Sequence, residues 1–317
     1  MPGQPGERVG TSSVPESEAN PPKIAGCILL AGGLVPSPLV EDARCPSLEL
    51  SLTARQTVFD RWCDVLFDAT VGDRDPLERP RLQVVHSGPP YRPRRDFQDP
   101  RFEVVTQEEP GSFRGPGGVL RDVTESYGDD DILLVAEAAR YIAGGLCQFI
   151  ADWARLRPDI LMACHPGGEP AGLMLVRRGS LELVPSEGFM DVKEQWLPKV
   201  VRAGLKVWTS ETRDFQPYPL RTREQFLRAS AVAAGLTANA AEPASVLGPP
   251  RVLGGGIDKS RVAQTARVAP GAVIADAIVM PGAVIGTGAI VVRSIVCPDA
   301  VIEDNAEVVD RIIPAAA

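Results

Sequence analysis

A repeat of 17 residues near the C-terminus constrains the fold of this chain more than any other feature. When residues 279–295 are aligned with residues 296–312, nine of the 17 columns are identical. Aliphatic residues recur in steps of six, six and five: Val262, Val268, Ile274, Val279, Ile285, Val291, Val296, Ile302 and Val308. One repeat is too short to bury its own apolar side, so successive repeats must stack as coils. The pattern predicts a parallel β-helix. A pair of β-hairpins would show strict alternation with period two, which the repeat lacks.

The repeat resembles the hexapeptide-repeat left-handed β-helix. That resemblance implies either an acyltransferase or a C-terminal oligomerising cap. Hexapeptide acyltransferases use a histidine as general base, because its near-neutral pKa suits proton abstraction. The two histidines of the chain, His86 and His165, both lie far upstream of the repeat. The structural role is therefore favoured, and we expect the coils to mediate a homo-oligomer or a hetero-oligomer.

Charge and cysteine content exclude several classes of function. The chain has 317 residues, a formal net charge of −8 and a pI of about 5.0, so no overall basic field attracts nucleic acid or an anionic membrane. Its six cysteines are scattered without the spacing of a zinc site, which predicts reduced and mostly buried thiols. No apolar run is long enough to cross a membrane. We expect a cytoplasmic protein that binds neither nucleic acid nor membrane.

Apolar and amphipathic segments alternate over residues 23–235, the pattern of an α/β sheet with helices on both faces. Strands are predicted at 25–31, 82–86, 102–106, 132–136 and 159–164. Helices are predicted at 55–69, 117–126, 140–155, 191–203 and 222–229. A β-hairpin is predicted at 172–184. Residues 1–22 are expected to be a disordered leader, and residues 236–260 a linker to the β-helix at 261–317.

A glycine turn directly follows the first predicted strand, at Leu30, Ala31, Gly32 and Gly33. Ligands of open α/β sheets bind beyond the carboxyl ends of the strands. Glycine lets backbone N–H groups approach a phosphate closely, because no Cβ obstructs them. These four residues are therefore candidates for contact with the phosphates of a ligand.

With a second glycine cluster at 115–118 and the β-helix, this turn resembles the sugar-phosphate nucleotidylyltransferases over residues 24–313. Examples are mannose-1-phosphate guanylyltransferase and glucose-1-phosphate adenylyltransferase. The resemblance implies a Rossmann-like, GT-A-like domain that binds a nucleotide or nucleotide sugar. In that interpretation Leu30, Ala31, Gly32 and Gly33 bind the nucleotide, and Gly115, Gly117 and Gly118 lie against the nucleobase. The first loop departs from the family, since Val35, Pro36 and Ser37 replace its Gly-Thr-Arg and the arginine that contacts the triphosphate is lost.

The resemblance also places the two Mg²⁺-binding aspartates of the family, and this chain has Ala138 and Pro219 at those positions. In such enzymes the ion neutralises the phosphates and orients them for in-line attack. Glu137 and Asp191 are alternative metal ligands, although a shift of one residue along a strand turns a side chain to the opposite face. We expect Mg²⁺ to be a cofactor only if the protein is an active enzyme.

Residues 188–200 resemble a family segment beside the sugar site, which makes Asp191 and Lys193 candidate catalytic residues. A second interpretation, compatible with the first, makes Asp191 a helix N-cap and Glu194 its capping-box partner.

Three hypotheses about function stay open. The protein is an active nucleotidylyltransferase with rearranged ligands, a non-catalytic homologue that binds a nucleotide or nucleotide sugar, or a structural or regulatory subunit of an active paralogue. The altered positions Ala138 and Pro219 favour impaired or absent catalysis.

Overall fold

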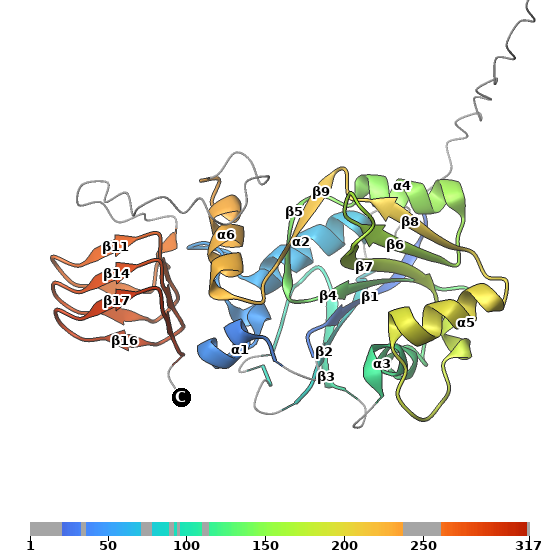
Figure 1. Cartoon of the computed structure of the whole chain (residues 1–317), viewed down its shortest axis with the longest axis horizontal. Helices are drawn as coiled ribbons and strands as arrows, with labels where there is room; N and C mark the ends of the chain where they lie inside the picture. The colour runs from blue at the N-terminus through green and yellow to red at the C-terminus, as the bar shows by residue number, and fades with distance from the viewer. Residues whose placement is uncertain are drawn as a thin grey trace, which may run out of the picture.

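In the computed structural model, an α/β domain is followed by a stack of β-coils (Figure 1). The structure describes residues 21–32, 36–70, 78–88, 92–93, 96–109, 114–236 and 261–315. Apart from residues 21, 22 and 236, the predicted leader and linker lie outside these ranges, so both stay predictions.

Seven strands form the central sheet in the order β3-β2-β1-β4-β7-β6-β8. Their bounds are β1 Ile24–Leu30, β2 Arg81–His86, β3 Glu103–Glu108, β4 Ile132–Glu137, β6 Ile160–Cys164, β7 Pro170–Arg177 and β8 Val207–Glu211. β7 runs antiparallel to both of its neighbours, while all other neighbouring pairs are parallel. The central strands are apolar runs because helices cover both faces of the sheet. All five strands predicted from the sequence are confirmed.

Helices α2 Val58–Thr70 and α4 Cys147–Leu156 pack on one face of the sheet. Helices α3 Gly115–Val123 and α5 Leu197–Arg202, with the preceding π-helical turn η3 Val192–Trp196, pack on the other. Each helix buries an apolar stripe at helical spacing, which in α2 includes Phe59, Trp62 and Leu66. Within the described ranges, no helix combines the length and apolarity that a membrane crossing requires. None of the six cysteines forms a disulfide and five are buried, as predicted.

Two predicted elements are wrong in part. The hairpin predicted at 172–184 is one strand, β7, followed by the 3-10 helix η2 Arg178–Leu183. β7 does not fold back on itself because β4 and β6 already pair with its two edges. The helix predicted at 140–155 begins only at Cys147, since its first residues form β5 Arg140–Gly144 and pair with β9 Phe215–Pro219. In both cases distant strand partners override the local pattern.

The 17-residue repeat forms stacked parallel coils, which confirms the β-helix-like architecture. Every paired residue lies 17 positions from its partner. Seven of the nine predicted aliphatic side chains are buried inside the coils, and Val262 and Val268 are partly buried there. The handedness stays a prediction. The strands are β10 Arg267–Val268, β11 Val273–Ala275, β12 Ile278–Val279, β13 Val284–Ile285, β14 Ile290–Val292, β15 Ile295–Val296, β16 Val301–Ile302, β17 Glu307–Val309 and β18 Ile312–Ile313.

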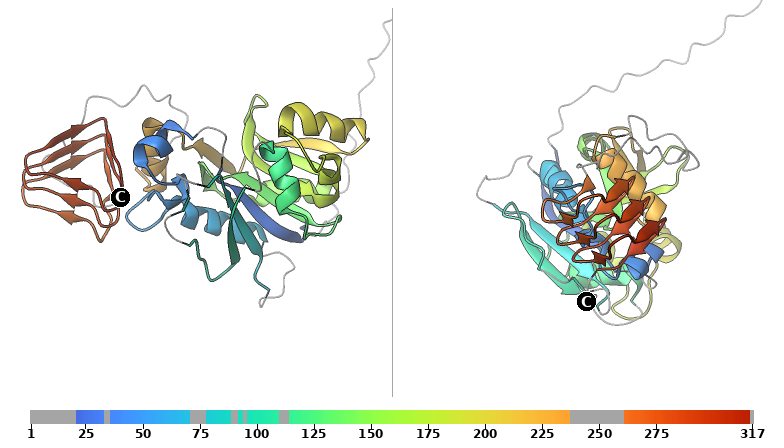
Figure 2. Two further views of the ribbon diagram at one scale, coloured as in Figure 1. Left: turned by 90° about the horizontal axis from the view of Figure 1, so that it is seen from below. Right: turned by 90° about the vertical axis from the view of Figure 1, so that its left-hand side faces the viewer.

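One outer side of the coils packs on the α/β domain. Helices α1 Pro38–Ala43 and α6 Arg223–Ala233 lie between the coils and the central sheet (Figure 2). Ile278 and Ile295 point out of the coils and join the same buried core as Leu39 of α1. The backbone N–H of Ala315 donates to the carbonyl of Ala43 at 3.1 Å. The two parts of the chain therefore share one continuous apolar core.

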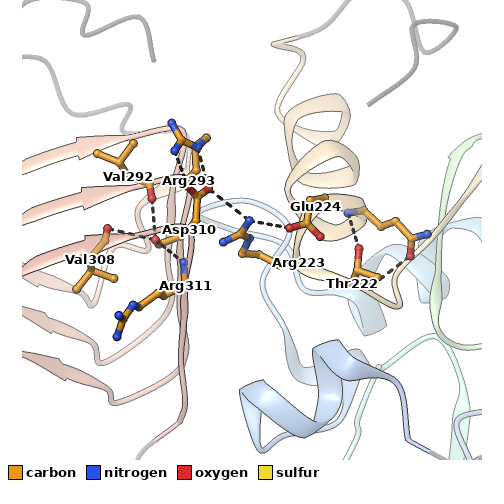
Figure 3. A network of polar contacts seen from close by, with 10 residues as sticks. Thr222, Arg223, Glu224, Val292, Arg293, Val308, Asp310 and Arg311 are labelled. Atoms are coloured by element: carbon orange, nitrogen blue, oxygen red, sulfur yellow. Dashed lines mark hydrogen bonds and ion pairs between the residues drawn. The ribbon is translucent and has the colours of Figure 1, made fainter. Parts of the chain in front are cut away.

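A polar network lies at the edge of this contact (Figure 3). Arg223, the first residue of α6, is 3.3 Å from Asp310 and also pairs with Glu224. Arg293 Nε donates to Asp310 Oδ1 at 2.8 Å, and this hydrogen bond is the main reason that the pKa of Asp310 lies below its usual value. Asp276, Arg293 and Asp310 occupy the same corner of successive coils, each with a left-handed φ near 50°. The network adds charge complementarity to a contact made mainly by apolar side chains.

We predict that Ile295→Ala lowers the free energy of unfolding by about 3 kcal/mol, because it leaves a cavity in the shared core. Ile290→Ala, in the same coil, is the matched control, since Ile290 is 40% exposed and the same truncation there costs under about 1 kcal/mol. Urea unfolding followed by circular dichroism measures both variants. Equal losses would show that the outward isoleucines do not hold the coils to the domain.

Candidate functional site

The strand order places a candidate ligand site between β1 and β4. From β1 the sheet extends through β2 to β3 on one side, and the chain then returns to form β4 on the other. Ligands of open α/β sheets bind at such a switch point, beyond the carboxyl ends of the strands. Leu30 ends β1 and pairs in register with Glu137, which ends β4. The N–H of Ala138 donates to the Leu30 carbonyl at 2.9 Å, so the two strand ends lie side by side.

The protein's own side chains surround the loop after β1. The N–H of Ala31 donates to the Val85 carbonyl at 2.7 Å. A Cβ added at Gly32 would overlap the carboxylate of Glu109 and lie 2.5 Å from Ser87 Oγ. Gly32 therefore leaves room for a close neighbour, and that neighbour is the protein's own Glu109 carboxylate. Gly33 lies outside the described residues, and nucleotide binding by this loop stays a prediction.

The Glu109 carboxyl group sits in a partly buried environment. Burial raises the pKa of Glu109 above its usual value, and a hydrogen bond with Ser87 opposes the shift. The Glu109 N–H donates to the His86 carbonyl at 2.8 Å, which fixes its backbone beside the end of β2. Burial lowers the pKa of His86, whose Nδ1 accepts a hydrogen bond from the N–H of Gly88 at 3.0 Å. A phosphate placed over Gly32 would meet an acidic group and no cation from these residues.

The second glycine cluster packs against the segment at 188–190. Gly115 has a left-handed φ of 65°, and a Cβ there would lie 2.7 Å from the Phe189 ring. The N–H of Gly117 donates to the Met190 carbonyl at 2.9 Å, and a Cβ at Gly118 would lie 3.0 Å from Arg114 Cβ. These contacts give each glycine a packing reason within the protein. The role of Gly115, Gly117 and Gly118 in base recognition stays a prediction.

Arg114 is a positioning residue that the sequence analysis missed. Its guanidinium donates to both carboxylate oxygens of Asp122, at 2.7 and 2.8 Å. It also donates to the carbonyls of Gly188 at 2.9 Å and Pro185 at 3.0 Å. Arg114 therefore holds the segment at 185–190 against the start of α3. The sequence spacing gave no signal for this pair, since only residues three or four apart are neighbours on a helix.

The two positions assigned to metal ligands by resemblance are neighbours in space. The N–H of Leu220 donates to the Ala139 carbonyl at 2.9 Å, and Arg140 pairs with Pro219 at the end of the β5–β9 ladder. Ala138 is fully buried, and its carbonyl accepts a hydrogen bond from Trp62 Nε1 at 3.1 Å. The β5–β9 ladder therefore brings these two parts of the chain together, but neither position carries a carboxylate.

Two arginines flank the acidic residue closest to these positions. Arg140 Nε and Nη2 lie 3.0 and 2.9 Å from Glu137 Oε2, and Arg221 Nη2 lies 3.8 Å from the same oxygen. A Cβ at Gly172 would overlap the Arg140 side chain, so this glycine of β7 makes room for the guanidinium. Glu137 is thus the acceptor in an ion pair at the carboxyl end of β4.

The residues present do not fit a bound Mg²⁺. Glu137 is already paired with Arg140 and lies near Arg221. The positive charges of these two arginines would repel an approaching cation. Asp191 Oδ1 accepts hydrogen bonds from the N–H groups of Lys193 at 2.7 Å and Glu194 at 2.8 Å, so it caps η3. Among the residues that the structure describes, no group of three or more His, Cys, Asp or Glu side chains is arranged to hold a metal ion.

The N-cap interpretation of Asp191 is confirmed, but its predicted partner is wrong. The N–H of Asp191 donates to Gln195 Oε1 at 2.7 Å, and Glu194 does not make this bond. The π-helical geometry of η3 adds a residue to the turn, which shifts the reciprocal contact by one position. The Lys193 side chain is exposed on the same turn. Catalytic roles for Asp191 and Lys193 stay predictions.

The C-terminal part of the chain is similar to a known protein family. Residues 230–311 match a family described as GlmU-like, C-terminal hexapeptide. The match covers less than half of the chain and supports the hexapeptide-repeat assignment of the coils. No curated protein matches the chain.

We predict that Ala138→Asp lowers the free energy of unfolding by roughly 3 kcal/mol, because a carboxylate replaces a fully buried methyl group. Ala139→Asp, at the partly exposed neighbour, is the control and should cost under about 1 kcal/mol. Chemical denaturation measures both. A stable Ala138→Asp protein would mean that the position still accommodates the family's carboxylate.

We predict that Glu109→Gln raises the urea midpoint at pH 7, and that its advantage shrinks as the pH falls. The folded-state pKa of Glu109 lies above its unfolded value, so the stability linked to its protonation is complete below the unfolded pKa. That stability is lost as the pH rises through the folded pKa, and glutamine does not titrate. Glu108→Gln, at the exposed neighbour, is the control. If the urea midpoints of Glu109→Gln and the unmodified protein changed with pH in parallel, a raised pKa of Glu109 would be ruled out.

Proposed function

We propose that this protein is a non-catalytic relative of the sugar-phosphate nucleotidylyltransferases, which binds a nucleotide or nucleotide sugar at the carboxyl edge of its sheet. The observation that carries the proposal is the pairing of residues 139–140, directly after Ala138, with residues 219–220. This pairing supports the assignment of Ala138 and Pro219 to the metal-ligand positions. The two segments lie together, as the resemblance requires of two ligands of one metal ion. Neither Ala138 nor Pro219 carries a carboxylate.

Loss of these carboxylates removes the chemistry of nucleotidyl transfer. Joining a nucleoside triphosphate to a sugar 1-phosphate develops charge on phosphate oxygens, and a positioned divalent cation normally stabilises it. Glu137 is already paired with Arg140, and Asp191 caps η3. We therefore propose that no divalent cofactor is used. The candidate site can bind and orient an anion without activating it.

The loop after β1 favours a diphosphate over a triphosphate. Glu109 lies beside Gly32, where the resemblance places the phosphates of the triphosphate. A third phosphate in this position would be repelled by a carboxylate in a partly buried setting, where charges interact more strongly than in water. A nucleoside diphosphate sugar needs no phosphate group there. It is therefore the ligand that this geometry supports best.

A second function, as a structural or regulatory subunit, is supported by the outer surface of the coils. Ile290 and Val301 are 40% and 66% exposed on two different sheets of the coils, β11-β14-β17 and β10-β13-β16. Contiguous exposed apolar surface commonly marks a contact with another chain. In this alternative, the coils join a second copy of the chain or an active paralogue. It becomes the preferred function if no nucleotide or nucleotide sugar binds.

The proposal predicts binding without turnover. Purified protein should release no pyrophosphate from any of the four common nucleoside triphosphates mixed with hexose 1-phosphates and Mg²⁺, because the metal ligands are missing. Calorimetric titration should show affinity for a nucleoside diphosphate sugar that exceeds its affinity for the matching triphosphate. Steady pyrophosphate release would overturn the proposal, and so would an absence of heat with guanosine, adenosine and uridine diphosphate sugars.

A further inference from the structure

We infer that Arg140 and Arg221 form an anion subsite for a diphosphate group, in which two guanidinium groups act where a divalent cation would be expected. The inference rests on the proposed function for the identity of the natural ligand, but its anion chemistry can be tested separately. It follows from the residues that lie just beyond Ala138 and Pro219 in the two paired segments.

Each metal-ligand position is followed two residues later by an arginine. Arg140 follows Ala138, and Arg221 follows Pro219. Because Arg140 pairs with Pro219, the ladder also brings Arg221 to the same strand end, where both guanidiniums approach Glu137 Oε2. Two cations and one carboxylate leave one net positive charge at the carboxyl end of β4. A site of this charge attracts a phosphate oxyanion.

Arg140 is the fixed member of the pair. Its side chain is only 13% exposed, and Glu137 holds its Nε and Nη2. Within the described ranges, no residue accepts a hydrogen bond from its Nη1. Gly172 has no Cβ, which leaves room for the Arg140 side chain beside it. Since a guanidinium presents several N–H donors in one plane, Arg140 can pair with Glu137 and keep donors for a second oxyanion.

Arg221 is the adaptable member. Its backbone is fixed, because its N–H donates to Gln225 Oε1 at 3.0 Å and its carbonyl accepts from the N–H of Leu39 at 3.0 Å. Its side chain is 63% exposed and stands 3.8 Å from Glu137, beyond hydrogen-bonding distance. The guanidinium can therefore turn to a ligand without breaking a hydrogen bond. Arg221 is the residue whose removal should affect anion binding with least effect on the fold.

Calorimetric titration with inorganic pyrophosphate in EDTA tests the subsite directly. We expect pyrophosphate to bind without Mg²⁺, and Arg221→Gln to weaken its binding about tenfold or more, because a charged hydrogen-bond donor is lost. Arg213→Gln is the matched control: Arg213 is also well exposed and stands 3.8 Å from Glu211, at the end of β8. Its affinity for pyrophosphate should equal that of the unmodified protein. Circular dichroism checks that both variants are folded.

The outcomes separate this inference from the proposed function. Pyrophosphate binding that requires Mg²⁺, or that is equal in Arg221→Gln and Arg213→Gln, overturns the subsite. A nucleoside diphosphate sugar that binds both variants equally in EDTA leaves the proposed function standing and removes the inference. Pyrophosphate binding that depends on Arg221, without affinity for any nucleotide or nucleotide sugar, supports the subsite and ends the proposed function. If neither pyrophosphate nor a nucleotide sugar binds, both are wrong.

Discussion

The candidate site depends on the backbone ladder between β5 and β9. These strands lie far apart in the sequence and outside the central sheet, yet their pairing places residues 139–140 against residues 219–220, close to the end of β4. Without this ladder, Glu137 would have only Arg140 beside it, because nothing else in the local sequence brings Arg221 close to Glu137. Hydrogen bonds between distant backbone segments therefore determine which charges meet at the switch point of the sheet.

Electrostatics distinguish this edge from one built around a bound cation. Glu109 places an acidic group beside Gly32, while the arginines at Glu137 place positive charge at the end of β4. Charge of opposite sign is thus separated along one edge of the sheet. An anion is favoured at one end and excluded at the other, which is why we propose binding of a diphosphate without nucleotidyl transfer.

The coils contribute stability and a surface for assembly. Their inner aliphatic columns hold the repeats together, while the outward isoleucines Ile278 and Ile295 belong to the core of the α/β domain. The same short strands thus bury apolar residues on both sides along one face of the coils. The other two sheets of the coils leave Ile290 and Val301 exposed, and the subunit hypothesis needs a partner chain that covers one of them.

The sequence by itself determined the coils and most of the central sheet. Their patterns are local, because a 17-residue period and runs of buried apolar residues are visible without knowing any distant contact. It also located Asp191 as an N-cap, a contact within one turn of helix.

Only the tertiary structure decided what surrounds the glycine turn and the positions of Ala138 and Pro219. Residues 140–144 read as the start of a helix until β9 pairs with them, and β7 reads as half of a hairpin until β4 and β6 occupy its edges. Glu109 and Arg221 give no signal in the sequence, since their roles arise from side chains that approach from separate strands and loops. Strand pairing over long separations in the chain is the physical reason, because it depends on which partners are available and not on the residues of one segment.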